Sequence, residues 1–153
     1  MANPVLLCSD GSEESVSAIE QGHALLAGSA EFEVVMVVDG PDPADLHGAS
    51  GHAGPVMTEE EFTAEHEAAV AETERALAAK AQRLGLDNAP RRMLQGDPGP
   101  AICAYAQQVD ATAIVMGSRG RSGLKRAVLG SVSDFVVRNA SCPVVVTPQS
   151  GVD

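Results

Sequence analysis

The segment from Gly117 to Ser131 has the composition of a loop that binds phosphate. It reads GSRGRSGLKRAVLGS and holds 4 of the chain's 10 Lys and Arg residues but none of its 21 acids. Glycine tolerates positive φ and lets a ligand approach main-chain N–H groups closely. Successive N–H groups in such a turn form an anion-binding concavity. These residues predict an anion site, and the alternative that they leave open is a surface loop whose charges only aid solubility.

A helix predicted to begin at Ser131 favours phosphate, because the first N–H groups and the dipole of a helix attract anions. The Ser131 hydroxyl adds a further donor. Two familiar phosphate loops do not occur in the sequence. A Walker A loop requires Gly-x4-Gly-Lys-Ser/Thr, and a Rossmann fingerprint requires Gly-x-Gly-x-x-Gly after the first strand, where this chain reads SDGSEE from Ser9 to Glu14. The predicted site is therefore a different kind of phosphate-binding loop.

Five short segments, of which four are apolar and the third along the chain is a weaker candidate, predict the strands that position this loop. They are Pro4–Cys8, Phe32–Val38, Arg91–Gln95, Ala113–Met116 and Pro143–Pro148. The runs are mostly continuous and rich in valine instead of alternating with polar residues, which is typical of a parallel sheet covered on both faces.

Helical periodicity between these runs predicts four helices. They are expected from Ser12 to Gly28, over Thr58–Leu84, over Ala101–Val109 and over Ser131–Asn139. Thr58 and Glu61 fit a capping box, and Gly85 is expected to end that helix. Asp97 is a predicted N-cap, with Pro98 at the first helical position.

The alternation of strands and helices predicts a single domain, residues 1–153, of the α/β class. We expect a five-stranded, parallel, doubly wound sheet with helices on both faces, in which the first and fourth strands are neighbours. Ligands of such sheets bind beyond the carboxyl ends of the strands, near the switch in strand order. Ser9-Asp10-Gly11, Asp39-Gly40 and the segment from Gly117 follow predicted strands at that edge.

Charge is divided unevenly along the chain, whose net charge is −11. Residues 1–74 hold 16 acids and no Lys or Arg, whereas residues 75–153 hold 5 acids and all 10 bases. An acidic chain with three Phe and one Tyr does not suit a nucleic-acid partner. The apolar runs are too short to span a membrane. Because the N-terminus lacks the layout of a signal peptide, a cytoplasmic protein is expected.

Several residues that invite a functional interpretation have a simpler one. The three cysteines form no CxxC pair and are expected to be small, buried or half-buried thiols: Cys8, Cys103 and Cys142. His47 and His52 have no acid or cysteine cluster to complete a metal site, so no metal site is predicted. His23 and His66 fall on apolar helical faces and are predicted to pack in the core.

Taken together, these segments resemble the universal stress protein family. The spacing Gly117-x2-Gly120-x9-Gly130-Ser131 is similar to the family's nucleotide-binding motif. VLLCSDGSE from Val5 looks like its first strand and turn, GDPGPAI from Gly96 like the entry into its third helix, and CPVVV from Cys142 like its last strand. The resemblance covers nearly the whole chain and implies a Rossmann-like fold of the adenine nucleotide alpha hydrolase kind.

Family members with this glycine spacing bind ATP, so the resemblance implies ATP as the ligand, with Mg or Mn as its possible companion. The triphosphate would meet Gly117, Arg119, Gly120, Gly130, Ser131 and Ser133, with Met116 and Val132 close by. The adenine and ribose would lie toward Ser9, Asp10 and the main chain near Val37. A carboxylate such as that of Asp10 suits ribose hydroxyls or the adenine amino group.

The favoured function is a regulatory protein of the stress response that binds ATP and signals by its bound state. The alternative is an enzyme on the same fold, a slow ATPase or a nucleotidyl-transfer catalyst. No Ser-His-Asp set or Walker B equivalent is evident, so no catalytic residue is predicted. A third hypothesis is a dimeric interaction module with an empty pocket, and the intact glycine spacing argues against it. The last strand is expected at a sheet edge, and the resemblance implies a homodimer through it.

Overall fold

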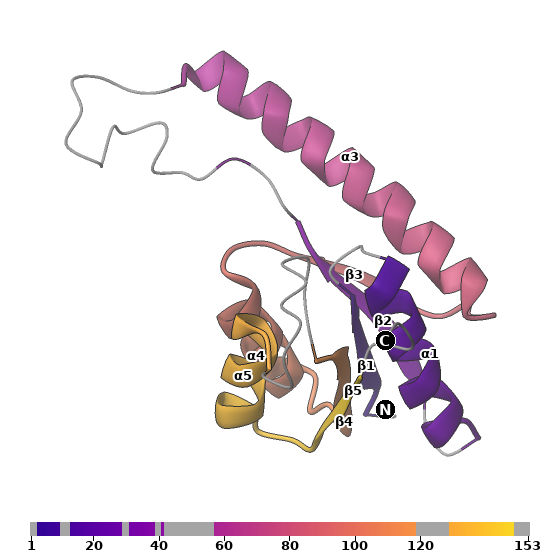
Figure 1. The fold of residues 1–153 in the computed structure, drawn as a ribbon. Helices are drawn as coiled ribbons and strands as arrows, with labels where there is room; N and C mark the ends of the chain where they lie inside the picture. The colour runs from indigo at the N-terminus through magenta and orange to yellow at the C-terminus, as the bar shows by residue number, and fades with distance from the viewer. Residues whose placement is uncertain are drawn as a thin grey trace.

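The computed structural model describes residues 3–9, 13–28, 31–38, 41, 57–118 and 129–148. Five strands lie within them: β1 (Val5–Ser9), β2 (Phe32–Val37), β3 (Arg91–Leu94), β4 (Ala113–Gly117) and β5 (Val144–Thr147). They form one parallel sheet in the order β3-β2-β1-β4-β5 (Figure 1). The predicted fold class is confirmed. The first and fourth strands are neighbours as expected, with Cys8 opposite Met116.

Helices cover both faces of this sheet. The described helices are α1 (Glu13–Leu26), α3 (Glu59–Arg83), α4 (Pro98–Gln108) and α5 (Ser131–Asn139). Figure 1 shows α1 and α3 on one side and α4 and α5 on the other. Leu7 of β1 packs with Ile19 of α1, whereas its neighbour Leu6 packs with Ile102 of α4. Because both faces of β1 are buried, its residues are apolar without alternation.

The signals at the helix ends are largely confirmed. Thr58 caps α3 by accepting a hydrogen bond from the Glu61 N–H, while the Glu61 carboxylate accepts one from the Thr58 N–H at 2.9 Å. Gly28 and Gly85 follow their helices with φ of +85° and +68°, the left-handed conformation that glycine tolerates. Helix α4 begins at Pro98, which confirms the prediction of proline at the first helical position, and it therefore starts before the predicted segment Ala101–Val109.

Some predicted details differ from the structure. Asp97 occupies the N-cap of α4, but its side chain makes no cap hydrogen bond. His23 and His66 are half-buried and pack against aromatic rings instead of lying in the core, His23 edge-on to Phe32 and His66 stacked on Phe62. The predicted loop Asp39–Pro55, with His47 and His52, lies almost entirely outside the described residues.

Helix α3 packs on the sheet through its second half only. Its buried residues are Thr73, Leu77, Lys80 and Ala81, and Figure 1 shows residues 59–72 extending past the sheet. A search of the described helices finds none with the length and hydropathy needed to cross a membrane.

Candidate functional site

The switch in strand order falls between β1 and β4. From β1 the sheet continues through β2 and β3 in one direction, and from β4 it continues to β5 in the other. Ser9 ends β1 and Gly117 ends β4, so these two predicted site residues lie at the carboxyl edge on either side of the switch. Val37 ends the adjacent strand β2. The structure therefore brings the strand-end part of the predicted site together.

The N-terminus of α5 lies at the same edge. The Ser118 N–H, just after β4, donates to the Thr147 carbonyl at 2.9 Å, and the Gly130 N–H donates to the Ser118 carbonyl at 2.7 Å. These two bonds bring the start of α5 next to the ends of β4 and β5. Residues 118 and 130 therefore lie in direct contact at the carboxyl edge of the sheet.

Ser133 reinforces this junction. Its buried hydroxyl lies 3.0 Å from the Ser118 carbonyl oxygen and 3.0 Å from the Gly130 carbonyl oxygen, and it donates to them. Its hydrogen is therefore directed at the main chain, so any contribution to a ligand comes from its N–H. Ser131 is exposed and Val132 is half-buried.

The start of α5 supplies the hydrogen-bond donors. The first N–H groups of a helix have no carbonyl within the helix to which they can donate. In α5 these are the N–H groups of Ser131, Val132 and Ser133. Gly130 is the N-cap with φ −63° and ψ 164°, an extended conformation that any residue adopts. Positive φ is therefore not the reason for glycine at position 130, and close approach of a ligand is the reason left for it.

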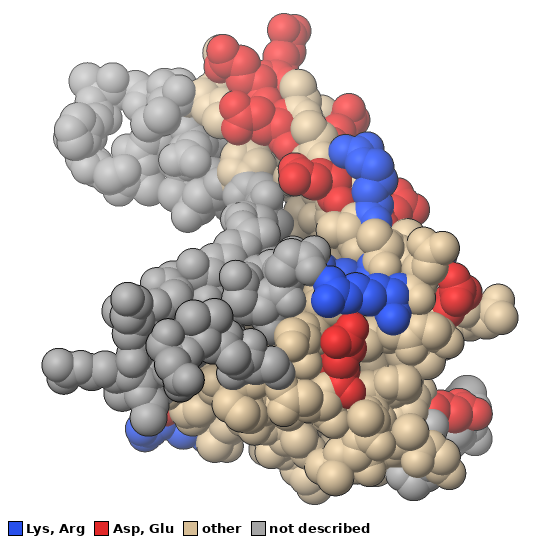
Figure 2. All heavy atoms as spheres, turned by 45° about the vertical axis from the view of Figure 1, so that its right-hand side comes forward, with Lys and Arg blue, Asp and Glu red and all other residues tan. Residues whose placement is uncertain are grey.

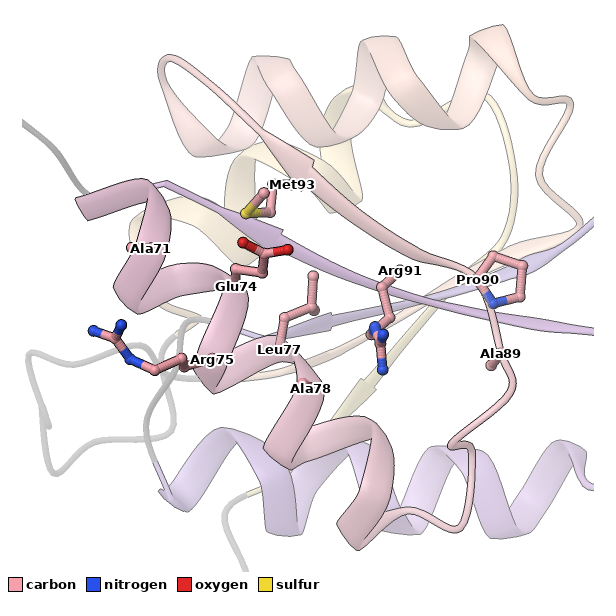
Figure 3. Close-up of a pocket in the computed structure, with 9 residues that line it drawn as sticks. All are labelled: Ala71, Glu74, Arg75, Leu77, Ala78, Ala89, Pro90, Arg91 and Met93. Carbon is pink, nitrogen blue, oxygen red and sulfur yellow. The ribbon is translucent and has the colours of Figure 1, made fainter. Parts of the chain in front are cut away.

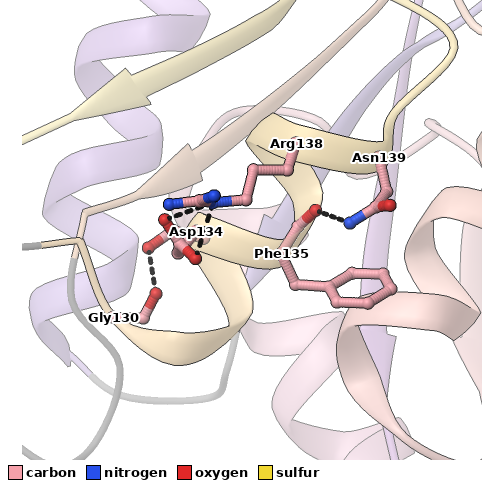
Figure 4. Close-up of polar contacts among 6 residues, drawn as sticks. Gly130, Asp134, Phe135, Arg138 and Asn139 are labelled. Atoms are coloured by element: carbon pink, nitrogen blue, oxygen red, sulfur yellow. Dashed lines mark hydrogen bonds and ion pairs between the residues drawn. The ribbon is translucent and has the colours of Figure 1, made fainter.

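The one acidic side chain in the first turn of α5, that of Asp134, is paired with an arginine. Asp134 lies in the first turn of α5, where its N–H donates to the Gly130 carbonyl (Figure 4). Its carboxylate would oppose a bound anion, but Arg138 one turn later holds it with a 3.1 Å ion pair. The helix dipole therefore remains available to an anion.

The helix on the other side of the switch is tied to the same edge. The Ser9 and Ser15 hydroxyls lie 2.8 Å apart, which links the end of β1 to the first turns of α1. The Thr147 hydroxyl donates to the Ala18 carbonyl at 2.6 Å, which links α1 to β5. Asp10, Arg119 and Gly120 lie outside the described residues. Within the described ranges, no three His, Cys, Asp or Glu side chains cluster as metal ligands would.

Comparison with known proteins decides the family. The family model described as the universal stress protein family matches residues 1–148. The chain belongs to this family. Among curated relatives, universal stress protein MJ0531 of Methanocaldococcus jannaschii is 48% identical over 54 residues, which span 35% of this chain and 32% of that relative. This relative is thus matched over about a third of its length.

Solved universal stress proteins share the fold over nearly the whole chain. UspA from Lactobacillus plantarum superposes with a TM-score of 0.74 at 23% identity, covering 95% of this chain and 97% of that one. A universal stress protein described in complex with cAMP has a TM-score of 0.66 at 23% identity, covering 97% and 99%. The Archaeoglobus fulgidus protein described in complex with dAMP has a TM-score of 0.57 at 19% identity, covering 95% and 97%.

Sequence reasoning did not identify two residues of this universal stress protein that hold the site in place. Ser118 joins β4, β5 and α5 through its main chain, and Thr147 joins β5 to α1 through its hydroxyl. Thr147 carries a detectable signal, because it is a polar residue at the carboxyl end of a strand. Ser118 carries none, since its role depends on main-chain groups that every residue has.

The three thiols are free as expected, and Cys8 is the most protected of them. Burial, assisted by the neighbouring thiols, raises the pKa of Cys8 to about 12. We expect iodoacetamide at pH 8 to alkylate Cys103 and Cys142 first, and Cys8 at least about a hundredfold more slowly, since the reactive thiolate is scarce and inaccessible. Mass mapping of a time course measures this. Equal rates for Cys8 and Cys103 in the folded protein would contradict it, and equal rates in urea are the control.

Proposed function

We propose that this protein is a regulatory ATP-binding protein of the stress response. The observation that carries the proposal is the position of the α5 N-terminus, which lies beside the ends of β4 and β5 at the switch in strand order. Three N–H groups without helical partners, the helix dipole and two adjacent strand ends together favour a bound phosphate group. The complexes of related proteins with cAMP and dAMP support a nucleotide as the ligand.

In this proposal the phosphates meet the loop and the helix start, and the nucleoside meets the strand ends. Gly117 and the N–H groups of Ser131, Val132 and Ser133 are the described residues on the phosphate side, with Arg119 and Gly120 as further predicted contacts. Ser9, Asp10 and Val37 remain the predicted contacts of ribose and adenine, and Met116 flanks them. The four bases of residues 117–131 favour a triphosphate over a monophosphate, because each added phosphate charge gains from them.

Regulation is favoured over catalysis by the side chains at the strand ends and helix start. The described predicted contacts are Gly, Ser, Val and Met, and none of these is a strong base able to activate water. A slow ATPase or nucleotidyl-transfer enzyme remains the alternative, in which Mg or Mn would accompany the nucleotide. Such an enzyme would be recognised by the release of ADP or AMP from ATP at a rate that depends on the metal.

Mass spectrometry of nucleotide released by denaturing the purified protein tests the proposal. We expect ATP, at up to one molecule per chain. Calorimetry on the nucleotide-free protein should then show ATP binding more tightly than AMP. Recovery of no nucleotide, together with no heat of binding for ATP, would refute ATP binding.

We also propose a homodimer through β5. This strand lies at a sheet edge and reads VVVT without a charge, whereas β3 at the other edge reads RRML. The like charges of β3 oppose pairing with a second copy of itself, whereas uncharged β-branched residues allow self-pairing. The Ile114 N–H donates to the Pro143 carbonyl, and the Ser118 N–H to the Thr147 carbonyl. Since main-chain groups alternate along a strand, those of Val146 face outward.

Val146→Pro is therefore expected to give a monomer, because it removes an outward N–H and leaves the bonds to β4 intact. Light scattering at micromolar concentration measures the mass. Met93→Pro is the matched control on the opposite edge and should leave the dimer unchanged. A monomeric parent protein would contradict the proposal. A cytoplasmic location remains a prediction, with which the three free thiols agree, since reducing compartments keep thiols free.

A further inference from the structure

A groove of about 650 Å³ lies between the second half of α3 and the edge strand β3, which is separated by β2 from β1 and the switch in strand order. Its lining comes from the helix and from the strand with the segment just before it: Ala71, Glu74, Arg75, Leu77, Ala78, Ala89, Pro90, Arg91 and Met93 (Figure 3). A groove bounded by a helix on one side and an edge strand on the other has the shape that accepts an extended peptide.

The floor of the groove is apolar and its rim is charged. Leu77 is buried, and Met93 is half-buried against the same core cluster. Glu74, Arg75 and Arg91 are exposed. Figure 3 shows Glu74 and Leu77 reaching from α3, with Arg91 and Met93 on the facing strand. An apolar side chain of a ligand can therefore be buried on this floor. The charged rim can then discriminate among the ligand residues that flank it.

The main chain of β3 offers hydrogen bonds along this groove. The Val34 N–H donates to the Pro90 carbonyl at 3.0 Å and the Val38 N–H to the Leu94 carbonyl at 2.8 Å, so Pro90 and Leu94 face β2. Main-chain groups alternate in direction along a strand. Those of Arg91 and Met93 therefore face outward, where the described part of the chain provides no further strand. An added strand would find both donors and acceptors there.

The two adjacent arginines of β3 have different roles. Arg92 lies on the α4 face, where its Nε donates to the Tyr105 hydroxyl at 3.1 Å, and Tyr105 in turn donates to the buried Glu33 carboxylate at 2.7 Å. Arg91 lies on the α3 face and makes no hydrogen bond or ion pair with another described residue, and the same is true of Arg75. Figure 2 shows acidic side chains over the free half of α3 and basic ones nearer the middle of this face. Among the described residues, the groove thus holds two arginines without a partner, Arg75 and Arg91, against one carboxylate, that of Glu74.

We propose that this groove binds an extended segment of a partner protein, which pairs with β3 as an added strand. Arg91 and Met93 are two residues apart, so their side chains share a face. The segment therefore presents an apolar residue to Met93 and Leu77 and an acidic residue, two positions away, to Arg91. The partner's recognition pattern is apolar-x-acidic. The main-chain bonds supply affinity, and these two side chains supply specificity.

A second copy of β3 is a poor occupant. Antiparallel pairing of two such strands about Arg92 would place its guanidinium opposite its own symmetry mate, and like charges directly opposite each other destabilise a sheet. An acidic partner meets no such repulsion at Arg91. The proposal is independent of ATP binding, because no lining residue of the groove belongs to the predicted nucleotide site.

Selection of random octapeptides displayed on phage against the folded full chain tests the proposal. We expect enriched peptides to share the apolar-x-acidic pattern. A synthetic peptide from that pool should shift the amide NMR signals of Arg91 and Met93. Arg91→Glu should weaken its binding at least tenfold, which corresponds to about 1.4 kcal/mol, while a peptide N-methylated on alternate residues should lose binding.

Arg138→Glu is the matched control, because it makes the same charge change on α5, away from the groove. It should leave peptide affinity within about twofold, and circular dichroism should show both variants folded. The proposal is overturned if no peptide is enriched, if enriched peptides lack the acidic residue, or if Arg91→Glu and Arg138→Glu bind them equally. Retained ATP binding in Arg91→Glu would separate this outcome from any failure of the nucleotide site.

Discussion

Replacing Gly22 with alanine is expected to destabilise the protein by about 2 kcal/mol, even though alanine is the better helix former. Gly22 lies in α1, where the helix crosses β4. A Cβ atom added there would stand 2.3 Å from Cγ1 of Val115, a side chain that is fully buried in the central sheet. Real carbon atoms do not approach so closely, so the helix or the strand has to move.

Magnitudes decide the sign of this effect. Glycine to alanine inside a helix gains about 1 kcal/mol from helix propensity. Overpacking a well-filled core costs about 1–3 kcal/mol and occasionally more. The cost at Gly22 belongs at the top of this range, because valine is stiff about its one side-chain torsion and cannot turn its methyl groups aside. The loss therefore exceeds the gain.

A double-mutant cycle with Val115→Ala isolates the contact. With both γ carbons removed, the nearest remaining atom to the new Cβ is the Cβ of residue 115 at 3.4 Å, an ordinary contact. Gly22→Ala should then cost little or add stability in the Val115→Ala background, with a coupling energy of about 2 kcal/mol from urea unfolding. Gly99→Ala in α4 is a comparison, because the atoms that it meets are Cδ1, Cγ and Cβ of Phe135 at 2.8, 2.9 and 3.1 Å, and turning the 37% exposed ring relieves only the contacts of the first two. Equal stability of Gly22→Ala and the parent would contradict the argument.

Most of the fold follows from local patterns. The valine-rich runs predict β1, β2, β4 and β5 within one residue at each end, because burial on both faces leaves few polar positions in a strand. Thr58 with Glu61 predicts the start of α3, since both partners of the capping box lie in one turn. The adjacency of β1 and β4 was expected for a doubly wound sheet, whereas right-handed crossovers alone do not determine the order of the other strands.

What sequence could not predict depends on segments that meet only in three dimensions. The Phe32–Val38 run contains Glu33, and nothing nearby says how a buried carboxylate is accommodated. In the structure the Tyr105 hydroxyl, 72 residues away, donates to the Glu33 carboxylate at 2.7 Å, and the Arg92 Nε lies 3.7 Å from the same carboxylate. The close approach of Gly22 to Val115 is of the same kind. Distances between non-local groups follow from the packing of whole elements, and composition does not encode them one by one.

The candidate site, like the fold, was predictable from the sequence only in part. The glycine spacing predicts where the phosphate site lies, and the strand order confirms that Ser9 and Gly117 lie on either side of the switch. The role of the Ser133 hydroxyl was not predictable, because its acceptor on Ser118 is 15 residues away. The charge division at residue 74 does not mark a domain boundary. Strands from both halves share one sheet: β1 and β2 of the acidic half pair with β4 and β3 of the basic half, respectively.

Replacing Gly130 with valine is expected to weaken ATP binding at least tenfold, without preventing folding. The backbone of Gly130 is extended, with φ −63° and ψ 164°, so valine can occupy it without strain. Stability should fall only by about 1 kcal/mol, since valine is a poorer N-cap than glycine. The branched side chain, however, would stand beside the free N–H groups of Ser131 and Val132 and hold a phosphate away from them.

Graded substitutions at the start of α5 separate steric exclusion from loss of a hydrogen bond. Gly130→Ala adds one carbon and should weaken ATP binding less than Gly130→Val does. Ser131→Ala removes a hydroxyl donor but keeps the N–H group, and should cost about 1–2 kcal/mol of binding energy. Titration calorimetry with ATP measures all three, and thermal unfolding shows that each variant is folded. If Gly130→Val bound ATP as tightly as the parent, the phosphates would not lie at the start of α5, because no ligand could reach those N–H groups past a valine side chain.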